Sequence, residues 1–113
     1  MKIPAAERAV IAPAKIRDYL LSTSHPVGRF KRPFFSSLGY TSANWRRLEI
    51  DLLELAVSGD AELGKQSQYG QKYEIRGILR GPSGRSARVL TVWIIPFGGN
   101  APQFVTAFPG EMT

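Results

Sequence analysis

The fold is decided by the run Val89-Leu90-Thr91-Val92-Trp93-Ile94-Ile95, which is apolar on both faces of an extended strand. A strand of this kind belongs in the middle of a sheet, covered on at least one side by helices. The segment before it, residues 72–80, alternates apolar and charged side chains, and Gly81-Pro82-Ser83-Gly84 between the two is a hairpin signal. We therefore expect an antiparallel sheet with strands over residues 72–80, 85–95 and 103–108.

The first half of the chain shows helical spacing instead. Ile16, Tyr19 and Leu20 form the apolar face of a short helix that begins at Pro13. A second helix is expected from residues 30–32 to Gly39, and a third from residues 41–42 to Gly59. The helices and the sheet are expected to share a core that contains Trp45, Leu48, Phe34, Phe35 and Trp93.

These patterns predict one α+β domain over residues 1–113, with about three N-terminal helices packed on one face of a C-terminal antiparallel sheet. The helical half is expected over about residues 1–60 and the sheet half over about residues 64–109. With 43% hydrophobic and 21% charged residues, the composition is that of a globular protein and excludes a disordered segment.

Basic residues exceed acidic ones, 15 to 9, which gives a net charge of +6 and a pI of about 10.1. Two windows without acidic residues, between Asp18 and Glu49 and between Glu74 and Glu111, hold much of the excess. Such windows suit a phosphate-bearing partner such as RNA, or they form a solvated surface. In the first case, the expected substrate-binding residues are Arg29, Arg76, Tyr73 and Thr91. In the second case, the two arginines are solvated, Tyr73 belongs to the core and Thr91 is an ordinary β-former.

The segment His25-Pro26-Val27-Gly28-Arg29-Phe30-Lys31 places the only histidine near a lysine at a predicted helix start. An imidazole gives and takes protons near neutral pH, and a lysine stabilises charge that grows on a phosphate. Arg88 and Thr106, on strands, are further candidates for phosphate contacts. The alternative is that His25 caps a loop, Lys31 and Arg88 are solvated and Thr106 is an ordinary strand residue.

Several classes of protein are excluded or disfavoured. Without cysteine and with a single histidine, a zinc site or a Cys-His nucleophile is not expected, and no Gly-rich nucleotide-binding pattern occurs. We expect no metal and no cofactor. No apolar stretch is long enough for a membrane span, so we also expect no membrane partner and a cytoplasmic location.

Taken together, these residues resemble an uncharacterised bacterial family of domains of the DUF6883 type. In the first half the resemblance lies in Ile3-Pro4-Ala5-Ala6-Glu7-Arg8-Ala9-Val10, Tyr19-Leu20-Leu21, His25-Pro26-x-Gly28-x-x-Lys31, Phe34-Phe35, Leu38-Gly39-Tyr40 and Trp45-x-x-Leu48. In the second half it lies in Tyr69-Gly70-x-x-Tyr73, Gly81-Pro82-x-Gly84-Arg85, Thr91-Val92-Trp93 and Val105-Thr106-Ala107-Phe108-Pro109. Phe108 stands where relatives are expected to have tyrosine, and Arg32 where a small residue is usual.

More remotely, the order of a helical half with histidine and lysine followed by a sheet ending in Thr-x-x-Pro is similar to metal-independent ribonuclease toxins of the barnase, EndoU and colicin type. That resemblance implies an RNA endonuclease that acts through a 2′,3′-cyclic phosphate and is neutralised by a cognate protein. It implies that His25 is the acid or base, that Lys31 and Arg88 stabilise the phosphorane and that Thr106 holds the phosphate. The alternative is a non-catalytic interaction or nucleic-acid-binding module of a two-gene pair.

Overall fold

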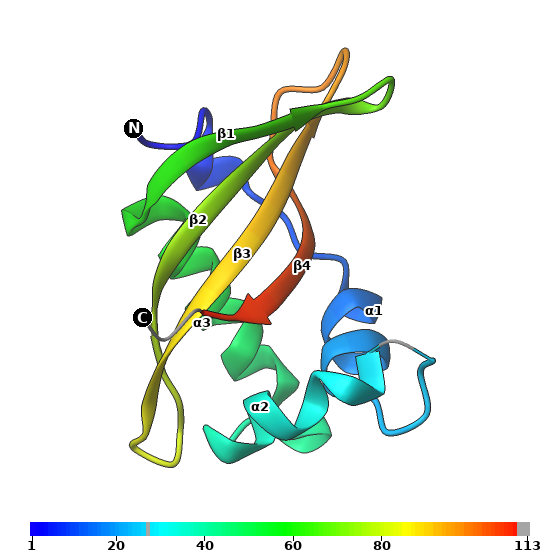
Figure 1. Cartoon of the computed structure of the whole chain (residues 1–113), viewed down its shortest axis with the longest axis vertical. Coiled ribbons are helices and arrows are strands. Elements are labelled where there is room, and N and C mark those ends of the chain that lie inside the picture. Colours follow the sequence, from blue (N-terminus) through cyan, green and yellow to red (C-terminus); the bar gives the residue numbers. More distant parts are fainter. Residues whose placement is uncertain (27, 111–113) are drawn as a thin grey trace.

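In the computed structural model, which describes residues 1–26 and 28–110, four antiparallel strands form a sheet (Figure 1). They are β1 (Asp60–Gln66), β2 (Gly70–Arg80), β3 (Ser86–Pro96) and β4 (Gln103–Pro109), in the spatial order β1-β2-β3-β4. The apolar run 89–95 thus lies in a central strand, between β2 and β4. The expected α+β order, with helices first and an antiparallel sheet after them, is confirmed.

Several short helices and one longer helix, α3, make up most of the first half. They are η1 (Ala6–Arg8), α1 (Pro13–Lys15), η2 (Ile16–Leu20), η3 (Gly28–Phe30), α2 (Arg32–Ser37), η4 (Ser42–Asn44) and α3 (Trp45–Ser58). The helix expected after Pro13 begins as α1 and continues as η2, a turn of π-helix. The longest helix, α3, packs against β2 behind the sheet, while α1 contacts β4 (Figure 1).

Local residue chemistry explains where the helices begin and end. The side chains of Thr41 and Asn44 exchange hydrogen bonds with each other's backbone N–H, which caps the start of η4 and leads directly into α3. At the end of α3, the Gly59 N–H donates to the Leu55 carbonyl oxygen at 2.7 Å. Both boundaries agree with the sequence prediction.

The core lies between the sheet and the helices. Phe35, Leu48 and Trp93 are fully buried, as expected, whereas Phe34 and Trp45 are partly buried and pack against the margin of the core. Thr91 is also fully buried. Its hydroxyl accepts a hydrogen bond from Trp93 Nε1 and donates one to the Ile75 carbonyl oxygen, each at 2.9 Å, so this polar group is satisfied inside the core.

Strand β1 corrects the prediction of three strands and of a sheet half that begins near Gly64. The sheet begins at Asp60, and β1 pairs with β2 along one edge. Only Ala61 of this strand is buried. Polar and apolar residues alternate only over residues 60–63, directly after the end of α3, and the second apolar residue, Leu63, is exposed. This run is too short and too weakly apolar to indicate a strand by its pattern.

The β2–β3 hairpin is docked on the end of α2. The Ser83 N–H donates to the Leu38 carbonyl oxygen at 3.0 Å. A Cβ atom on Gly81 would lie 1.9 Å from the same oxygen, so only glycine permits this approach. Gly39, with φ of 97°, completes the turn that ends α2. This contact fixes the helix that carries Lys31 at its start.

Candidate functional site

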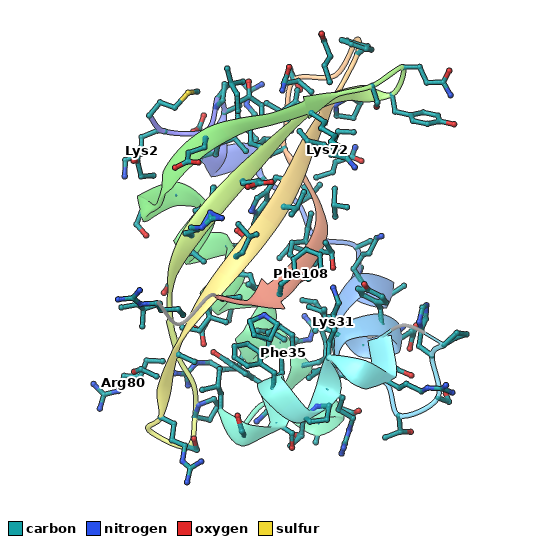
Figure 2. All side chains as sticks on the ribbon, viewed as in Figure 1. Lys2, Lys31, Phe35, Lys72, Arg80 and Phe108 are labelled. Atoms are coloured by element: carbon teal, nitrogen blue, oxygen red, sulfur yellow. The ribbon has the colours of Figure 1, made fainter. Side chains whose placement is uncertain are left out.

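Lys31 joins the helical half of the protein to the edge of the sheet. Its Nζ donates hydrogen bonds to Thr106 Oγ1 at 2.6 Å and to the Ala107 carbonyl oxygen at 3.1 Å, both on β4. The ammonium also lies 3.8 Å from the centre of the Phe108 ring, and Figure 2 shows the two side chains next to each other at the end of β4. No described carboxylate pairs with Lys31, so its charge is not neutralised by an acid within residues 1–26 and 28–110.

A β-bulge places Thr106 within reach of Lys31. Trp93 pairs with Phe104 and the adjacent Val92 pairs with Thr106, so β4 has one extra residue between these two pairs. The bulge lets Phe104 and Ala107 both be buried while Thr106 stays partly exposed. Bulges commonly re-aim side chains near functional sites, and this one presents the Thr106 hydroxyl at the edge of the sheet.

Tyr19 is the third member of the cluster, and it comes from the π-turn η2. Its hydroxyl lies 3.2 Å from Thr106 Oγ1, and its ring lies 5.3 Å from Lys31 Nζ. Burial raises the pKa of Tyr19, but the hydrogen bonds of Thr106 and Lys31, with the charges of Lys31 and Lys15, lower it more. The net pKa therefore lies below the ordinary tyrosine value of about 10, which favours the ionised form.

His25 lies against Tyr19 with its ring edge-on, 4.9 Å between ring centres. Its Nδ1 accepts a hydrogen bond from the Gly28 N–H at 2.9 Å, and the backbone N–H of His25 donates to Ser22 Oγ at 3.0 Å. Because Nδ1 acts as an acceptor, the neutral ring carries its proton on Nε2. In this conformation His25 is a hydrogen-bond donor through Nε2 and has no lone pair available there for a base.

Gly28 allows the loop with His25 to pack on η2. A Cβ atom at position 28 would lie 1.9 Å from the Tyr19 carbonyl oxygen, so any larger residue would push the loop away. The Gly28 carbonyl oxygen accepts a hydrogen bond from the Lys31 N–H at 2.8 Å. The spacing His-Pro-x-Gly-x-x-Lys thus has a structural reason: the glycine positions both His25 and Lys31.

An open groove of about 630 Å³ runs beside this cluster. It is lined by Ala12, Ala14, Lys15, Asp18, Tyr19, His25, Val105 and Thr106. Lys31 touches two of these lining residues. The Asp18 carboxylate is paired with Arg17 at 3.4 Å, while the Lys15 ammonium lies 5.9 Å from the centre of the Tyr19 ring. The groove therefore offers hydroxyl, imidazole and ammonium groups to a ligand.

The structure brings together three of the eight site residues predicted from the sequence: His25, Lys31 and Thr106. Arg29 lies in η3, next to this cluster along the chain. The other four lie elsewhere. Arg76 and Arg88 are exposed on β2 and β3, whereas Tyr73 and Thr91 are buried in the core, where a substrate cannot reach them in this conformation.

Sequence reasoning missed Tyr19 as a site residue because it fits the apolar stripe of the first helix. Its polar hydroxyl was the available signal, since the other stripe residues, Ile16 and Leu20, are aliphatic. Phe108 stands where relatives are expected to have tyrosine, and its ring faces the Lys31 ammonium.

In residues 1–26 and 28–110, no group of three or more histidine, cysteine, aspartate or glutamate side chains is arranged to hold a metal ion.

Comparisons with known proteins bear on fold and family. No curated protein matches the chain by sequence. The fold is similar to that of one chain of a contact-dependent growth inhibition toxin - immunity protein complex from Klebsiella pneumoniae 342, with a TM-score of 0.72 and 16% identity over 96% of this chain and 98% of that chain. At this identity the likeness shows a shared fold. Within residues 1–26 and 28–110, no helix has the length and hydrophobicity needed to cross a membrane.

The family comparison covers almost the whole sequence. The family described as "Domain of unknown function (DUF6883)" matches residues 2–111. The chain therefore belongs to the DUF6883 family.

Proposed function

We propose that this chain is a toxin domain that cleaves RNA without a metal ion. In this reaction a ribose 2′-hydroxyl attacks the adjacent phosphate and leaves a 2′,3′-cyclic phosphate. The observation that carries the proposal is the Lys31 ammonium held on Thr106 and Ala107 beside the groove lined by Tyr19 and His25. The fold shared with a chain of a growth-inhibition toxin–immunity complex adds support.

The cluster suits a phosphodiester because it collects positive charge and hydrogen-bond donors in one place. The Lys31 charge acts on a phosphate in the groove across Thr106, and Lys15 adds a second charge at the groove wall. Such preorganised donors stabilise the negative charge that develops on the phosphoryl oxygens in the transition state. No metal is needed when the nucleophile is the substrate's own 2′-hydroxyl.

His25 has a more restricted role here than a general base. With Nδ1 occupied by the Gly28 N–H, the ring offers Nε2–H to a phosphoryl oxygen. To act as a base through Nε2, the ring would have to give up this hydrogen bond and carry its proton on Nδ1. We therefore assign His25 to binding and orienting the phosphate.

RNA is the proposed substrate, and a separate protein is the proposed partner. A nuclease of this kind damages the cell that makes it unless a partner covers the groove. A non-catalytic module remains the alternative proposal, and the two differ in one measurable property, the breaking of phosphodiester bonds.

The test is cleavage of a defined RNA pool in EDTA by the purified chain. The rates of the Lys31→Met and Lys65→Met variants are compared with the rate of the unmodified protein. Lys65 is an exposed lysine of β1, so its replacement controls for the loss of one positive charge. We expect cyclic-phosphate ends from the unmodified protein and from Lys65→Met. Lys31→Met is expected to be slower by about 10²- to 10³-fold, the typical cost of removing one preorganised donor.

Two results would decide against this function. RNA that is bound but left intact by the unmodified chain would favour the interaction module. Cleavage that is lost in EDTA and restored by a divalent cation would contradict a metal-independent reaction.

A further inference from the structure

We propose that Tyr19 is a catalytic residue of this site, which donates its hydroxyl proton to the leaving 5′-oxygen of the RNA. The inference rests on the proposed RNA cleavage and adds the group that completes the proton transfer. His25 does not fill this role in the present conformation, because its neutral ring carries a single proton, on Nε2, and Nδ1 is occupied by Gly28.

The direction of the hydrogen bonds leads to Tyr19. Lys31 Nζ has no lone pair, so it must donate to Thr106 Oγ1, at 2.6 Å. The Thr106 hydroxyl hydrogen then needs another acceptor, and the Tyr19 oxygen lies 3.2 Å away. When Thr106 donates to Tyr19, the phenol's own hydrogen points away from Thr106. Since Tyr19 lines the groove, this hydrogen is available to a ligand there.

The surroundings of Tyr19 also stabilise the ion that remains after proton donation. The groups that face it are the ammonium groups of Lys15 and Lys31, the imidazole of His25 and, on the groove wall, the Asp18 carboxylate. Burial alone would raise the pKa of Tyr19, but the hydrogen bonds and the two ammonium charges lower it. Tyr19 is thus a stronger acid than an ordinary tyrosine.

Water and hydroxide from solvent take part in the remaining proton transfers of the reaction. Hydroxide from solvent removes the 2′-hydroxyl proton, and the 2′-oxygen forms a bond to phosphorus. The bond from phosphorus to the 5′-oxygen breaks, and that oxygen takes the proton of Tyr19. The tyrosinate, held by Thr106 and the lysine charges, then regains a proton from water. His25 binds a phosphoryl oxygen through Nε2–H and keeps its proton.

The first experiment compares Tyr19→Phe with Tyr69→Phe in single-turnover cleavage of an RNA oligonucleotide. Tyr69 is an exposed tyrosine in the turn between β1 and β2 and provides the matched control. We expect Tyr19→Phe to be about 10²- to 10⁴-fold slower, the usual contribution of one general acid, with Tyr69→Phe unchanged. RNA affinity should change little in either variant.

The second experiment separates proton donation from a merely structural role. A uridine 3′-(4-nitrophenyl phosphate) has a leaving group that departs without a proton. On this substrate the defect of Tyr19→Phe should largely disappear.

The pH dependence of the rate is a further test of proton donation. The RNA cleavage rate of the unmodified protein should rise with pH and level off at the Tyr19 pKa, below about 10, and Tyr19→Phe should lack this break. Lys15→Met should move the break to higher pH, because one charge that favours the tyrosinate is gone.

The possible results are distinct. If the unmodified protein cleaves neither substrate, the proposed function fails and the role of Tyr19 fails with it. If the protein cleaves RNA and Tyr19→Phe is as fast, or is equally slow on both substrates, only the role of Tyr19 as acid is overturned.

Discussion

Two tyrosines of this protein have opposite electrostatic surroundings. Tyr19 lies at the groove, where its hydroxyl meets Thr106 and two lysine charges. Tyr40 is buried in the core, and its hydroxyl donates to Asp51 Oδ2 at 2.5 Å. Burial, followed by the hydrogen bond and the charge of Asp51, raises the pKa of Tyr40 far above its ordinary value, whereas the pKa of Tyr19 is lowered.

The difference shows what decides whether a tyrosine is structural or reactive. Burial opposes ionisation at both positions, although Tyr40 is the more deeply buried, so the direction of this effect does not separate them. The sign of the neighbouring charge does. A carboxylate fixes the Tyr40 proton in place and makes this residue part of the packing, while ammonium groups leave the Tyr19 proton transferable.

Among the changes that test this comparison of the two tyrosines, the largest expected effect comes from removing the positive charge beside Tyr19. Lys31→Gln keeps N–H donors for Thr106 and Ala107 but loses the charge. We expect RNA cleavage to fall by about 10²-fold and the pKa of Tyr19 to rise, because tyrosinate and phosphorane both lose a stabilising cation. The Tyr19 pKa is measured from the ultraviolet absorbance of tyrosinate during a pH titration. The signal of Tyr19 is the difference between the titration of Lys31→Gln and the titration of the double variant Lys31→Gln/Tyr19→Phe. A Tyr19 pKa unaffected by Lys31→Gln would contradict the comparison.

The next effect concerns stability at the other tyrosine. Tyr40→Phe removes a buried hydrogen bond to a carboxylate that still has Arg47 at 3.2 Å. Loss of a hydrogen bond to a charged group costs about 1.5–3 kcal/mol, and we expect that decrease in the free energy of unfolding by urea denaturation. RNA cleavage should stay unchanged, with Tyr69→Phe as the control. A Tyr40→Phe protein of normal stability and reduced cleavage would reverse the roles assigned to the two regions.

The smallest expected effect concerns the free energy of unfolding at alkaline pH, to which the two tyrosines contribute with opposite dependence on pH. Tyr40 has a raised pKa in the folded state, so its stabilising contribution is complete below about pH 10, the unfolded value, and is lost as the pH rises above it. Tyr19 has a lowered pKa in the folded state, so its stabilising contribution is complete above about pH 10, the unfolded value, and is lost as the pH falls through the folded pKa. Relative to the unmodified protein, Tyr40→Phe should flatten the alkaline loss of stability and Tyr19→Phe should steepen it. Parallel unfolding curves for the two variants between about pH 8 and 11 would show that the two tyrosines titrate alike.

Much of the fold could be predicted because its signals are local. The caps at Thr41 and Gly59, the hairpin at residues 81–84 and the central strand all depend on residue types within one turn or one strand. Strand β1 could not be predicted, because its alternating pattern is limited to residues 60–63, next to the end of α3, and most of the strand is exposed. Its position follows from pairing with β2, which is a tertiary interaction.

The site was predictable only in part for a related reason. The spacing from His25 to Lys31 is local, and the loop holds both residues as the spacing suggested. The bulge that orients Thr106 and the π-turn that orients Tyr19 depend on contacts between distant segments. No pattern of residues in the sequence predicts either of them. Without the register of the sheet, sequence reasoning could not separate Thr106 at the edge from Thr91 in the core.

The hydrogen bond between Lys31 and Thr106 also has a consequence for synthesis of the chain on the ribosome. The helical half emerges first, and the last strand of the sheet emerges long after Lys31. Until β4 has left the exit tunnel and paired with β3, Lys31 and Tyr19 have no Thr106 to hold them together. On the RNA cleavage proposed above, a nascent chain without β4 lacks the assembled cluster, and we expect it not to cleave the RNA of the ribosome that makes it. A partner that binds on emergence of β4 would then act in time to prevent damage.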